Sequence, residues 1–343
     1  MRQVAFSDTN WRQWLARLLE KWAVFFPAEV EGSVHWLRMQ PAALSRSGIS
    51  PAPAFREIRA AEPVKSFFFA PAEKVATFPD KLEPAAGEKR VLLGVKGCDL
   101  AALKVHDTMF ATGEFADPFF RQRRENSVLI AADCPVPADS CFCNLVGGRP
   151  YAAEGADLSL AVIDGTYLVE VLSEAGEELL QTGSDLFQPA NEGLVQKRNE
   201  ERRNAERRLA EANPKPLRED LPAALATRDR DAKFWADAAA DCVECSGCLM
   251  GCPTCYCFLL YDKVRESGTE RTRVWDACYL AAYQRVGGGA NARAEFRKRF
   301  VNRFHCKFQH FKNAHGFYAC SGCGRCFLTC MGKIDIRKIL AAV

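Results

Sequence analysis

The sequence predicts an α+β protein in which an N-terminal α/β domain precedes a mostly helical, cysteine-rich domain. Three observations support this prediction. A buried-strand pattern at 90–95 runs through a turn into a helical stretch, which is an α/β unit. A long, highly charged segment at 191–212 separates two parts of different composition. Beyond it, the spacing C-x2-C-x2-C-x3-C occurs twice, at 242–252 and 320–330.

Composition limits the classes of function. The chain has 343 residues, of which 48% are hydrophobic, enough for two domains with their own cores. Its formal net charge of +3 is small, so no nucleic-acid partner is expected. The N-terminus lacks the apolar segment of a secretory signal, and no apolar run is long enough to span a bilayer. With sixteen cysteines and no sign of an oxidising compartment, we expect a soluble, cytoplasmic protein.

The first elements are expected to be a helix, a loop and a short strand. Apolar and aromatic residues recur at helical spacing over 8–26, with Asp8 or Thr9 as the N-cap, and this aromatic stripe is interpreted as core. Residues 40–64 are rich in proline and alanine and predict a loop. Residues 66–69 predict a short strand.

The α/β unit continues with alternating elements. The strand that opens it leads into a helix over 100–110, and a second buried strand is predicted at 127–132. Segments 158–163 and 167–172 flank the turn signal Asp164-Gly165 and predict a β-hairpin.

Four cysteines lie just past these strand ends or in adjoining loops, where α/β folds usually place their sites. They are Cys98, Cys134, Cys141 and Cys143, called set C below. Four thiols in a chain without a secretory signal indicate a metal site, with Asp99 as a candidate supporting group.

Residues 191–212 mix acidic and basic side chains and predict a solvated helix with i,i+4 pairs. Pro214 and Pro216 end it, and a further helix is expected over 221–240. The predicted division is an α/β domain at 1–190, a charged helical linker at 191–240 and a cysteine-rich domain at 241–343.

The duplicated cysteine motif is the strongest chemical signal. Its spacing is that of bacterial ferredoxins with two [4Fe–4S] clusters, in which three cysteines of each motif bind one cluster and the fourth binds the other. This assigns cluster A to Cys242, Cys245, Cys248 and Cys330. Cluster B falls to Cys320, Cys323, Cys326 and Cys252. A zinc ribbon needs two separated C-x2-C pairs and disulfides need an oxidising compartment, so both alternatives fit poorly.

A long insertion, from Cys252 to Cys320, separates the two motifs of this ferredoxin-like domain. Its triple glycine at 287–289 lacks a phosphate-loop context and is interpreted as a flexible turn. A basic helix over 293–303 is expected to form salt bridges with a partner or to neutralise the charge of the clusters. A short helix after Lys333 is expected to close the chain.

Eight cysteines remain outside the duplicated motif. For set C we favour a third [4Fe–4S] cluster over a zinc site or metal-free buried thiols, because buried thiols alone do not explain the Cys-x-Cys at 141–143. The other four are scattered over the insertion and are weaker candidates for a fourth cluster. They are Cys255, Cys257, Cys278 and Cys306, called set D below.

Several unusual motifs follow one another from about residue 65 to the end. They are Gly94 to Leu100 around Cys98-Asp99, Asp133-Cys134, Cys141-Phe142-Cys143 followed by Gly147 to Pro150, CPTCYC at 252–257, Trp275 to Cys278, and CGRC at 323–326. In this order they resemble the iron–sulfur subunit family that includes the beta subunit of cytoplasmic sulfhydrogenases and the corresponding iron–sulfur subunit of anaerobic sulfite reductases.

The resemblance implies an electron-transfer subunit. It would relay electrons between an FAD/NAD(P)-binding diaphorase-type subunit and a catalytic subunit, such as a NiFe hydrogenase, a sirohaem sulfite reductase or another reductase. Two alternatives remain. Set D would build a catalytic cluster of the heterodisulfide or polysulfide reductase type, or the clusters would be structural or redox-sensing in an interaction protein.

Overall fold

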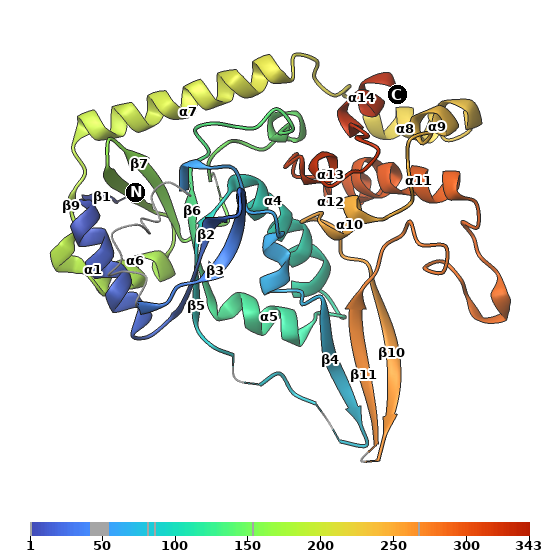
Figure 1. Cartoon of the computed structure of the whole chain (residues 1–343), viewed down its shortest axis with the longest axis horizontal. Coiled ribbons are helices and arrows are strands. Elements are labelled where there is room, and N and C mark those ends of the chain that lie inside the picture. Colours follow the sequence, from blue (N-terminus) through green and yellow to red (C-terminus); the bar gives the residue numbers. More distant parts are fainter. Residues whose placement is uncertain (1, 42–54, 81, 86, 153, 267) are drawn as a thin grey trace.

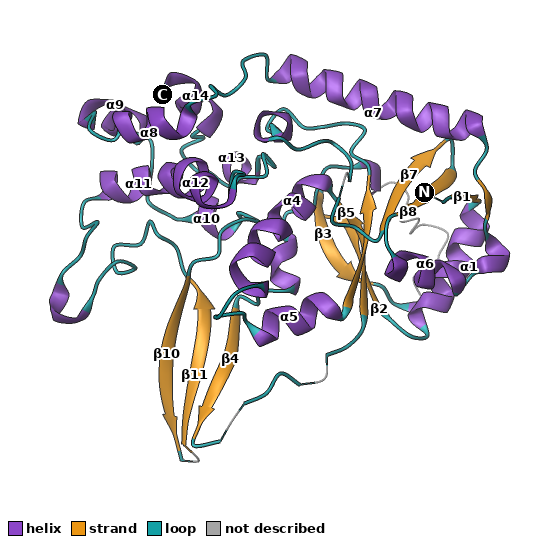
Figure 2. Cartoon of the chain, turned by 180° about the vertical axis from the view of Figure 1, so that it is seen from behind, coloured by secondary structure: helices purple, strands orange, loops and turns teal. Residues whose placement is uncertain are grey.

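The computed structural model describes residues 2–41, 55–80, 82–85, 87–152, 154–266 and 268–343. Two β-sheets organise this part of the chain (Figures 1 and 2). One has eight strands, all from residues 3–189, and the other is a three-stranded arm that projects from the body. No described helix is both long and apolar enough to cross a membrane.

The large sheet has the strand order β3-β2-β5-β6-β7-β8-β1-β9. β2, β5, β6 and β7 run parallel, and the other neighbours pair antiparallel. Its strands are β1 (Gln3–Phe6), β2 (Ala23–Val30), β3 (Ser33–Arg38), β5 (Arg90–Val95), β6 (Ser127–Ala132), β7 (Leu158–Ile163), β8 (Thr166–Val171) and β9 (Gln188–Pro189). β5 and β6 have the predicted bounds, and the pairing of Ile163 with Thr166 confirms the hairpin around Asp164-Gly165.

Helix α1 (Asp8–Leu19) packs its aromatic stripe into the core of the large sheet, as predicted. Trp11 and Trp14 are fully buried. The Trp11 ring stacks on Tyr167 of β8 with centroids 4.5 Å apart, so the helix is fixed to the antiparallel side of the sheet.

The predicted helix over 8–26 is too long, and its N-cap prediction is wrong. The helix ends at Leu19, because residues from Ala23 on pair with β5 in the sheet. Its N-cap is Ser7, whose hydroxyl accepts a hydrogen bond from the backbone N–H of Asn10.

The predicted strand at 66–69 is also wrong. Its first residues belong to the 3₁₀ helix η1 (Val64–Phe67), and the N–H groups of Phe68 and Phe69 both donate to the carbonyl of Lys65. Both phenylalanine rings are fully buried, so burial rather than strand pairing explains this apolar run. Most of the predicted loop at 40–64 lies outside the described residues.

The remaining helical segments up to residue 186 connect these strands along the chain. They are α4 (Gly97–His106), the π-helix η2 (Asp107–Ala111), α5 (Pro118–Glu125), the 3₁₀ helix η3 (Cys143–Val146), α6 (Glu174–Gln181) and the 3₁₀ helix η4 (Ser184–Leu186). α4 begins three residues earlier than predicted, directly after β5, so Cys98 and Asp99 lie in its first turn.

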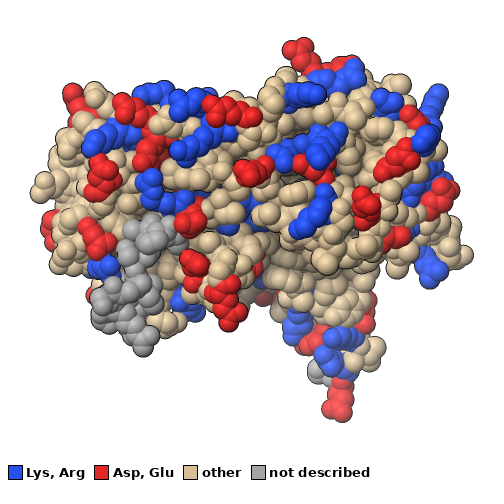
Figure 3. Space-filling view, turned by 45° about the horizontal axis from the view of Figure 1, so that its top comes forward, with Lys and Arg blue, Asp and Glu red and all other residues tan. Residues whose placement is uncertain are grey.

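Helix α7 (Glu192–Ala212) runs from the large sheet to the C-terminal helices, along the top in Figure 1. The single helix expected over 221–240 is instead two, α8 (Leu221–Arg228) and α9 (Ala232–Ala238). The break is stabilised by Asp231, whose carboxylate caps α9 at Phe234. Acidic and basic side chains are interspersed over the face shown in Figure 3, in line with the small net charge.

Beyond α9 the helices are short and alternate with loops. They are α10 (Gly247–Met250), the 3₁₀ helix η5 (Gly287–Gly289), α11 (Phe296–Phe304), the π-helix η6 (His305–His310), α12 (Phe311–His315), α13 (Arg325–Leu328) and α14 (Ile336–Ala342). Their core contains the buried rings of Trp235, Tyr279, Phe300, Phe304 and Phe308.

The insertion between the cysteine motifs carries a β-hairpin that was not predicted from the sequence. Strands β10 (Phe258–Arg265) and β11 (Gly268–Trp275) pair antiparallel, and β11 also pairs with β4 (Ala72–Phe78) from the N-terminal half. At the base of this arm the buried Arg273 forms ion pairs with Glu73 and Asp117, so the insertion is joined to the α/β part.

Candidate metal centre

All sixteen cysteines lie in the described residues, and none forms a disulfide. The fold brings them together in neighbouring groups that can be compared with the four predicted sets. Among the described residues, no three His, Cys, Asp or Glu side chains are placed to hold a single metal ion.

The four cysteines assigned to cluster A, called group A below, lie close enough for their charges to interact. The charges of Cys245, Cys248 and Cys330 all act on the Cys242 thiol. Glu244 and Ser246 have φ of 54° and 57°, so the loop between these cysteines turns through the left-handed region. Burial raises the pKa of both Cys242 and Cys248.

The four cysteines assigned to cluster B, called group B below, also lie together, deeper in the molecule. Cys320 has Cys326 and Cys252 as neighbours, and Cys326 has Cys323 and Cys252. Burial raises the pKa of Cys320 to about 12 and that of Cys326 to about 11. The charge of Cys248 also acts on the Cys326 thiol, so groups A and B adjoin.

Buried cations accompany these thiols. Arg303 of α11 is 5% exposed and has Cys248 and Cys326 as neighbours. Lys307 of η6 is 4% exposed, and its ammonium donates to the Cys252 sulfur at 3.4 Å and to the Thr254 hydroxyl at 2.7 Å. An interior cation is costly without a nearby negative charge, so these positions fit an anionic group held by thiolates.

Set C lines one cavity. Cys98 lies at the start of α4, Cys134 follows β6, Cys141 lies just before η3, and Cys143 is the first residue of η3. All four border the same cavity, together with Cys323 of group B. The Cα of Cys143 and a Cβ built on Gly322 would be only 2.5 Å apart, so the loops of sets B and C pack against each other without space for a side chain.

A buried guanidinium also borders the cavity of set C. Arg59 is 6% exposed, and its Nη1 lies 3.5 Å from the Cys141 sulfur. Its Nε and Nη2 are buried without a hydrogen-bond partner in the described part of the chain. Such a group needs an acceptor, and an anionic cluster bound by the four thiols would provide sulfur acceptors.

An ion pair joins the loops of sets B and C. Arg325, next to Cys326, donates to both carboxylate oxygens of Asp99, next to Cys98, at 2.8 and 3.2 Å. The two side chains are 3% and 1% exposed. Arg325 also donates two hydrogen bonds to the carbonyl of Ala60. Asp99 therefore holds Arg325 between these two loops.

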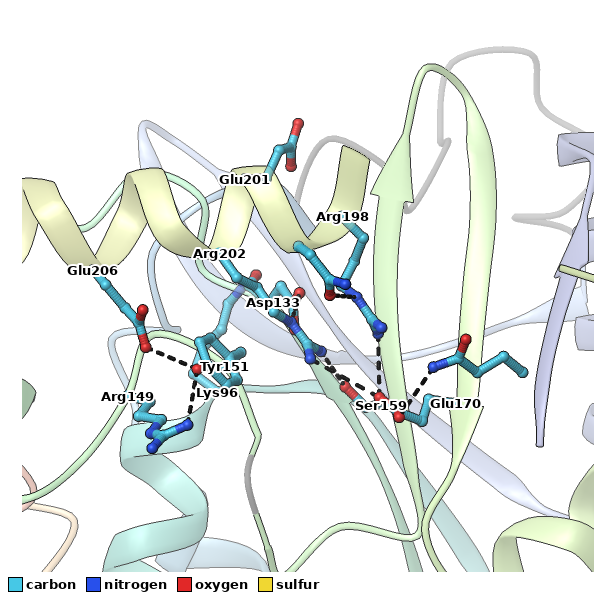
Figure 4. Close-up of polar contacts among 12 residues, drawn as sticks. Lys96, Asp133, Arg149, Tyr151, Ser159, Glu170, Arg198, Glu201, Arg202 and Glu206 are labelled. Carbon is cyan, nitrogen blue, oxygen red and sulfur yellow. Dashed lines mark hydrogen bonds and ion pairs between the residues drawn. The ribbon is translucent and has the colours of Figure 1, made fainter. Parts of the chain in front are cut away.

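Helix α7 is tied to the sheet beside Cys134 by a polar network (Figure 4). Arg202 donates to Asp133 at 2.7 and 2.9 Å and to Ser159, while Arg198 donates to Glu170. The helix predicted to be solvated therefore has one buried polar face, on which Arg198 is 4% exposed.

Set D is brought together in part around Cys257. The thiol of Cys278 lowers the pKa of Cys257 to about 6, and the N–H of Asp276 donates to the Cys257 carbonyl at 3.0 Å. Cys306 lies within range of Cys257 and Cys278. Cys255 lies against Cys252 of group B.

The thiols could be identified from the sequence, but most of the cations around them could not. Four of them were not among the predicted site residues, yet the structure buries them all: Arg59, Lys65, Lys307 and Arg325. The basic helix is the exception, because neutralisation of cluster charge was one of its two predicted roles and Arg303 lies where that role requires it.

Known proteins resemble this chain both in its cysteine-rich region and over most of its length. Residues 241–334 match the family model of the 4Fe-4S dicluster domain. The chain is 31% identical over 284 residues to Sulfhydrogenase 2 subunit beta from Pyrococcus furiosus, covering 82% of each protein. The chain belongs to this iron–sulfur subunit family. The dicluster match supports two [4Fe–4S] clusters in this sulfhydrogenase beta-type subunit, as the cysteine spacing predicted.

Proposed function

We propose that this sulfhydrogenase beta-type subunit is the electron-relay component of a multisubunit oxidoreductase. The observation that carries the proposal is the contiguity of the cysteine groups. Group A adjoins group B through Cys248 and Cys326, and group B adjoins set C through Cys323. When bound, the clusters supply one-electron chemistry.

In this proposal cluster A is held by Cys242, Cys245, Cys248 and Cys330, and cluster B by Cys320, Cys323, Cys326 and Cys252. The buried cations act on the electron affinity of the site. Because Arg303 and Lys307 lie beside these thiols, they favour the more negative, reduced state, and burial opposes it. The balance of the two sets the reduction potentials.

The proposal extends to a third [4Fe–4S] cluster on Cys98, Cys134, Cys141 and Cys143. It is supported by the shared cavity and by the unpartnered nitrogens of Arg59. Replacing Cys98 by alanine should lower iron and acid-labile sulfide by about four atoms each per chain, because one cube holds four of each. Unchanged iron in the Cys98→Ala variant would exclude this cluster.

For the partners, we propose an FAD/NAD(P)-binding diaphorase-type subunit and a catalytic hydrogenase or reductase subunit in the cytoplasm. The name of the Pyrococcus furiosus relative, a sulfhydrogenase subunit, supports a multisubunit complex. The sixteen free thiols support a reducing compartment.

Anaerobic purification of the native complex tests this role. We expect a flavin subunit to copurify, and we expect NAD(P)H to bleach the cluster absorption of the complex but not of the isolated subunit. Reduction of a disulfide or polysulfide by the isolated, cluster-loaded subunit with a dye as donor would instead support a catalytic role.

A further inference from the structure

Four thiols outside sets A to C converge on one side of group B. Cys257 and the segment of Cys278 come from the two ends of the β10–β11 hairpin and meet there, where the N–H of Asp276 donates to the Cys257 carbonyl at 3.0 Å. Cys306 lies within range of both, and its sulfur is 3.9 Å from the Tyr256 hydroxyl. Cys255 lies against Cys252 and shares the neighbour Lys65 with Cys257 and the neighbour Lys307 with Cys306, so it lies between group B and the other three thiols.

The local backbone is arranged around this group. The hairpin returns the chain so that Trp275 pairs with Phe258, which brings the segments carrying Cys278 and Cys257 together. Cys306 lies in the π-helix η6, a widened helical turn of the kind often found at functional sites. Three segments distant in the sequence therefore contribute thiols to one place.

Two buried lysines lie between this group and group B. Lys307 has Cys255 and Cys306 among its neighbours, in addition to Cys252 and Cys320. Lys65 is 2% exposed and has Cys255, Cys252 and Cys257 as neighbours. Its ammonium donates to the Cys255 carbonyl at 2.8 Å and lies 4.1 Å from the centre of the Trp275 ring.

These lysines are not compensated by carboxylates. Neither forms an ion pair with Asp or Glu in the described part of the chain, where their hydrogen bonds go to carbonyl, hydroxyl and sulfur atoms. Two ammonium groups at this depth require negative charge nearby. Cluster B accounts for one anionic group, beside Lys307. Lys65 adjoins cluster B through Cys252, but it also binds the Cys255 carbonyl and adjoins Cys257, which indicates a second anionic group on that side.

We propose that Cys255, Cys257, Cys278 and Cys306 bind a further [4Fe–4S] cluster, beside cluster B. The donor set is thiolate alone, which is the set that iron–sulfur clusters use. Cluster B then has neighbours on three sides, groups A, C and D, and is the branch point of the relay. This proposal for set D is independent of which partner subunits exchange electrons with the protein.

The experiment uses the full-length protein, purified anaerobically and reconstituted with iron and sulfide. Cys278→Ala and Cys306→Ala are compared with the wild type and with Tyr256→Phe, which removes the hydroxyl near Cys306 but no thiol. Iron and sulfide are counted per chain, and Mössbauer spectra show whether the iron is in cubes. Dicluster signals are followed by EPR.

We expect each cysteine variant to lose about four irons and four sulfides relative to the wild type, because one cube is lost. Tyr256→Phe should keep the wild-type count, and the EPR signal of clusters A and B should persist in all variants. Iron unchanged in Cys278→Ala and Cys306→Ala would overturn the proposal.

A second measurement covers the case in which these variants do not fold. In the folded wild-type protein, purified and reconstituted anaerobically, a Cys257–Cys278 disulfide would overturn the proposal, because sulfurs joined in a disulfide cannot bind iron as thiolates. Failure of the protein to exchange electrons with a flavin partner would contradict the relay but would leave the iron count of set D unaffected.

Discussion

Removal of the Asp99 carboxylate is the sharpest structural test of how the cluster loops are held. Asp99→Asn keeps the shape of the side chain but leaves the guanidinium of Arg325 buried without its counter-charge. Breaking a buried ion pair from one side costs about 3–5 kcal/mol. The hydrogen bonds from Arg325 to Ala60 remain, but a carbonyl does not neutralise the charge.

The expected change in melting temperature follows from chain length. At about 2.1 cal/mol/K per residue, 343 residues give an unfolding entropy of about 0.7 kcal/mol/K. The loss of about 3–5 kcal/mol then corresponds to a decrease in Tm of about 4–7 °C if the chain unfolds in one transition. Anaerobic differential scanning calorimetry of the cluster-loaded protein, at one scan rate, measures it.

The same helix provides the matched control. Lys104 and Glu154 form an ion pair at 2.7 Å, but their side chains are 53% and 73% exposed. Lys104→Met should therefore change stability by at most about 1 kcal/mol. In the double variant Asp99→Asn/Arg325→Met the buried charge is gone, so Tm should recover in part. A decrease in Asp99→Asn no larger than that of Lys104→Met would refute the reasoning.

Two further predictions concern the contact between cluster loops and the role of metal. Gly322→Ala should impair iron loading of both group B and set C, because its Cβ would lie 2.5 Å from the Cys143 backbone. Gly113→Ala is the control: this glycine also has a positive φ, but a Cβ there would have no atom within 4 Å, so the variant should load iron normally. Equal iron contents in the two variants would contradict the predicted contact. Removal of iron by a chelator should make residues 241–343 sensitive to protease while the large sheet persists, because thiolates and cations pack around the clusters. Limited proteolysis with mass spectrometry measures this change. An unchanged digestion pattern would contradict the prediction.

Local patterns predicted the elements that depend on neighbouring residues. Three strands are apolar runs ended by turn signals, and all three have the predicted bounds: 90–95, 127–132 and 158–163. The two-cluster prediction also depended on local spacing, since three ligands of each cluster lie within seven residues.

Elements set by distant contacts could not be predicted in this way. Residues from Ala23 continue the helical spacing of α1, yet pairing with β5 makes them a strand. The arm forms because β11 pairs with β4, almost two hundred residues earlier, a contact that leaves no local signal. Likewise Lys65 and Arg59 resemble surface residues until the fold places them beside thiols.

EPR-monitored redox titration of the anaerobic, full-length protein tests the central claim, a relay built from adjacent clusters, most directly. We predict reversible one-electron reduction, with simple signals at partial reduction that become spin-coupled at full reduction, because groups A and B adjoin at Cys248 and Cys326. Clusters that are not reversibly reduced, or that show no coupling when fully reduced, would contradict it.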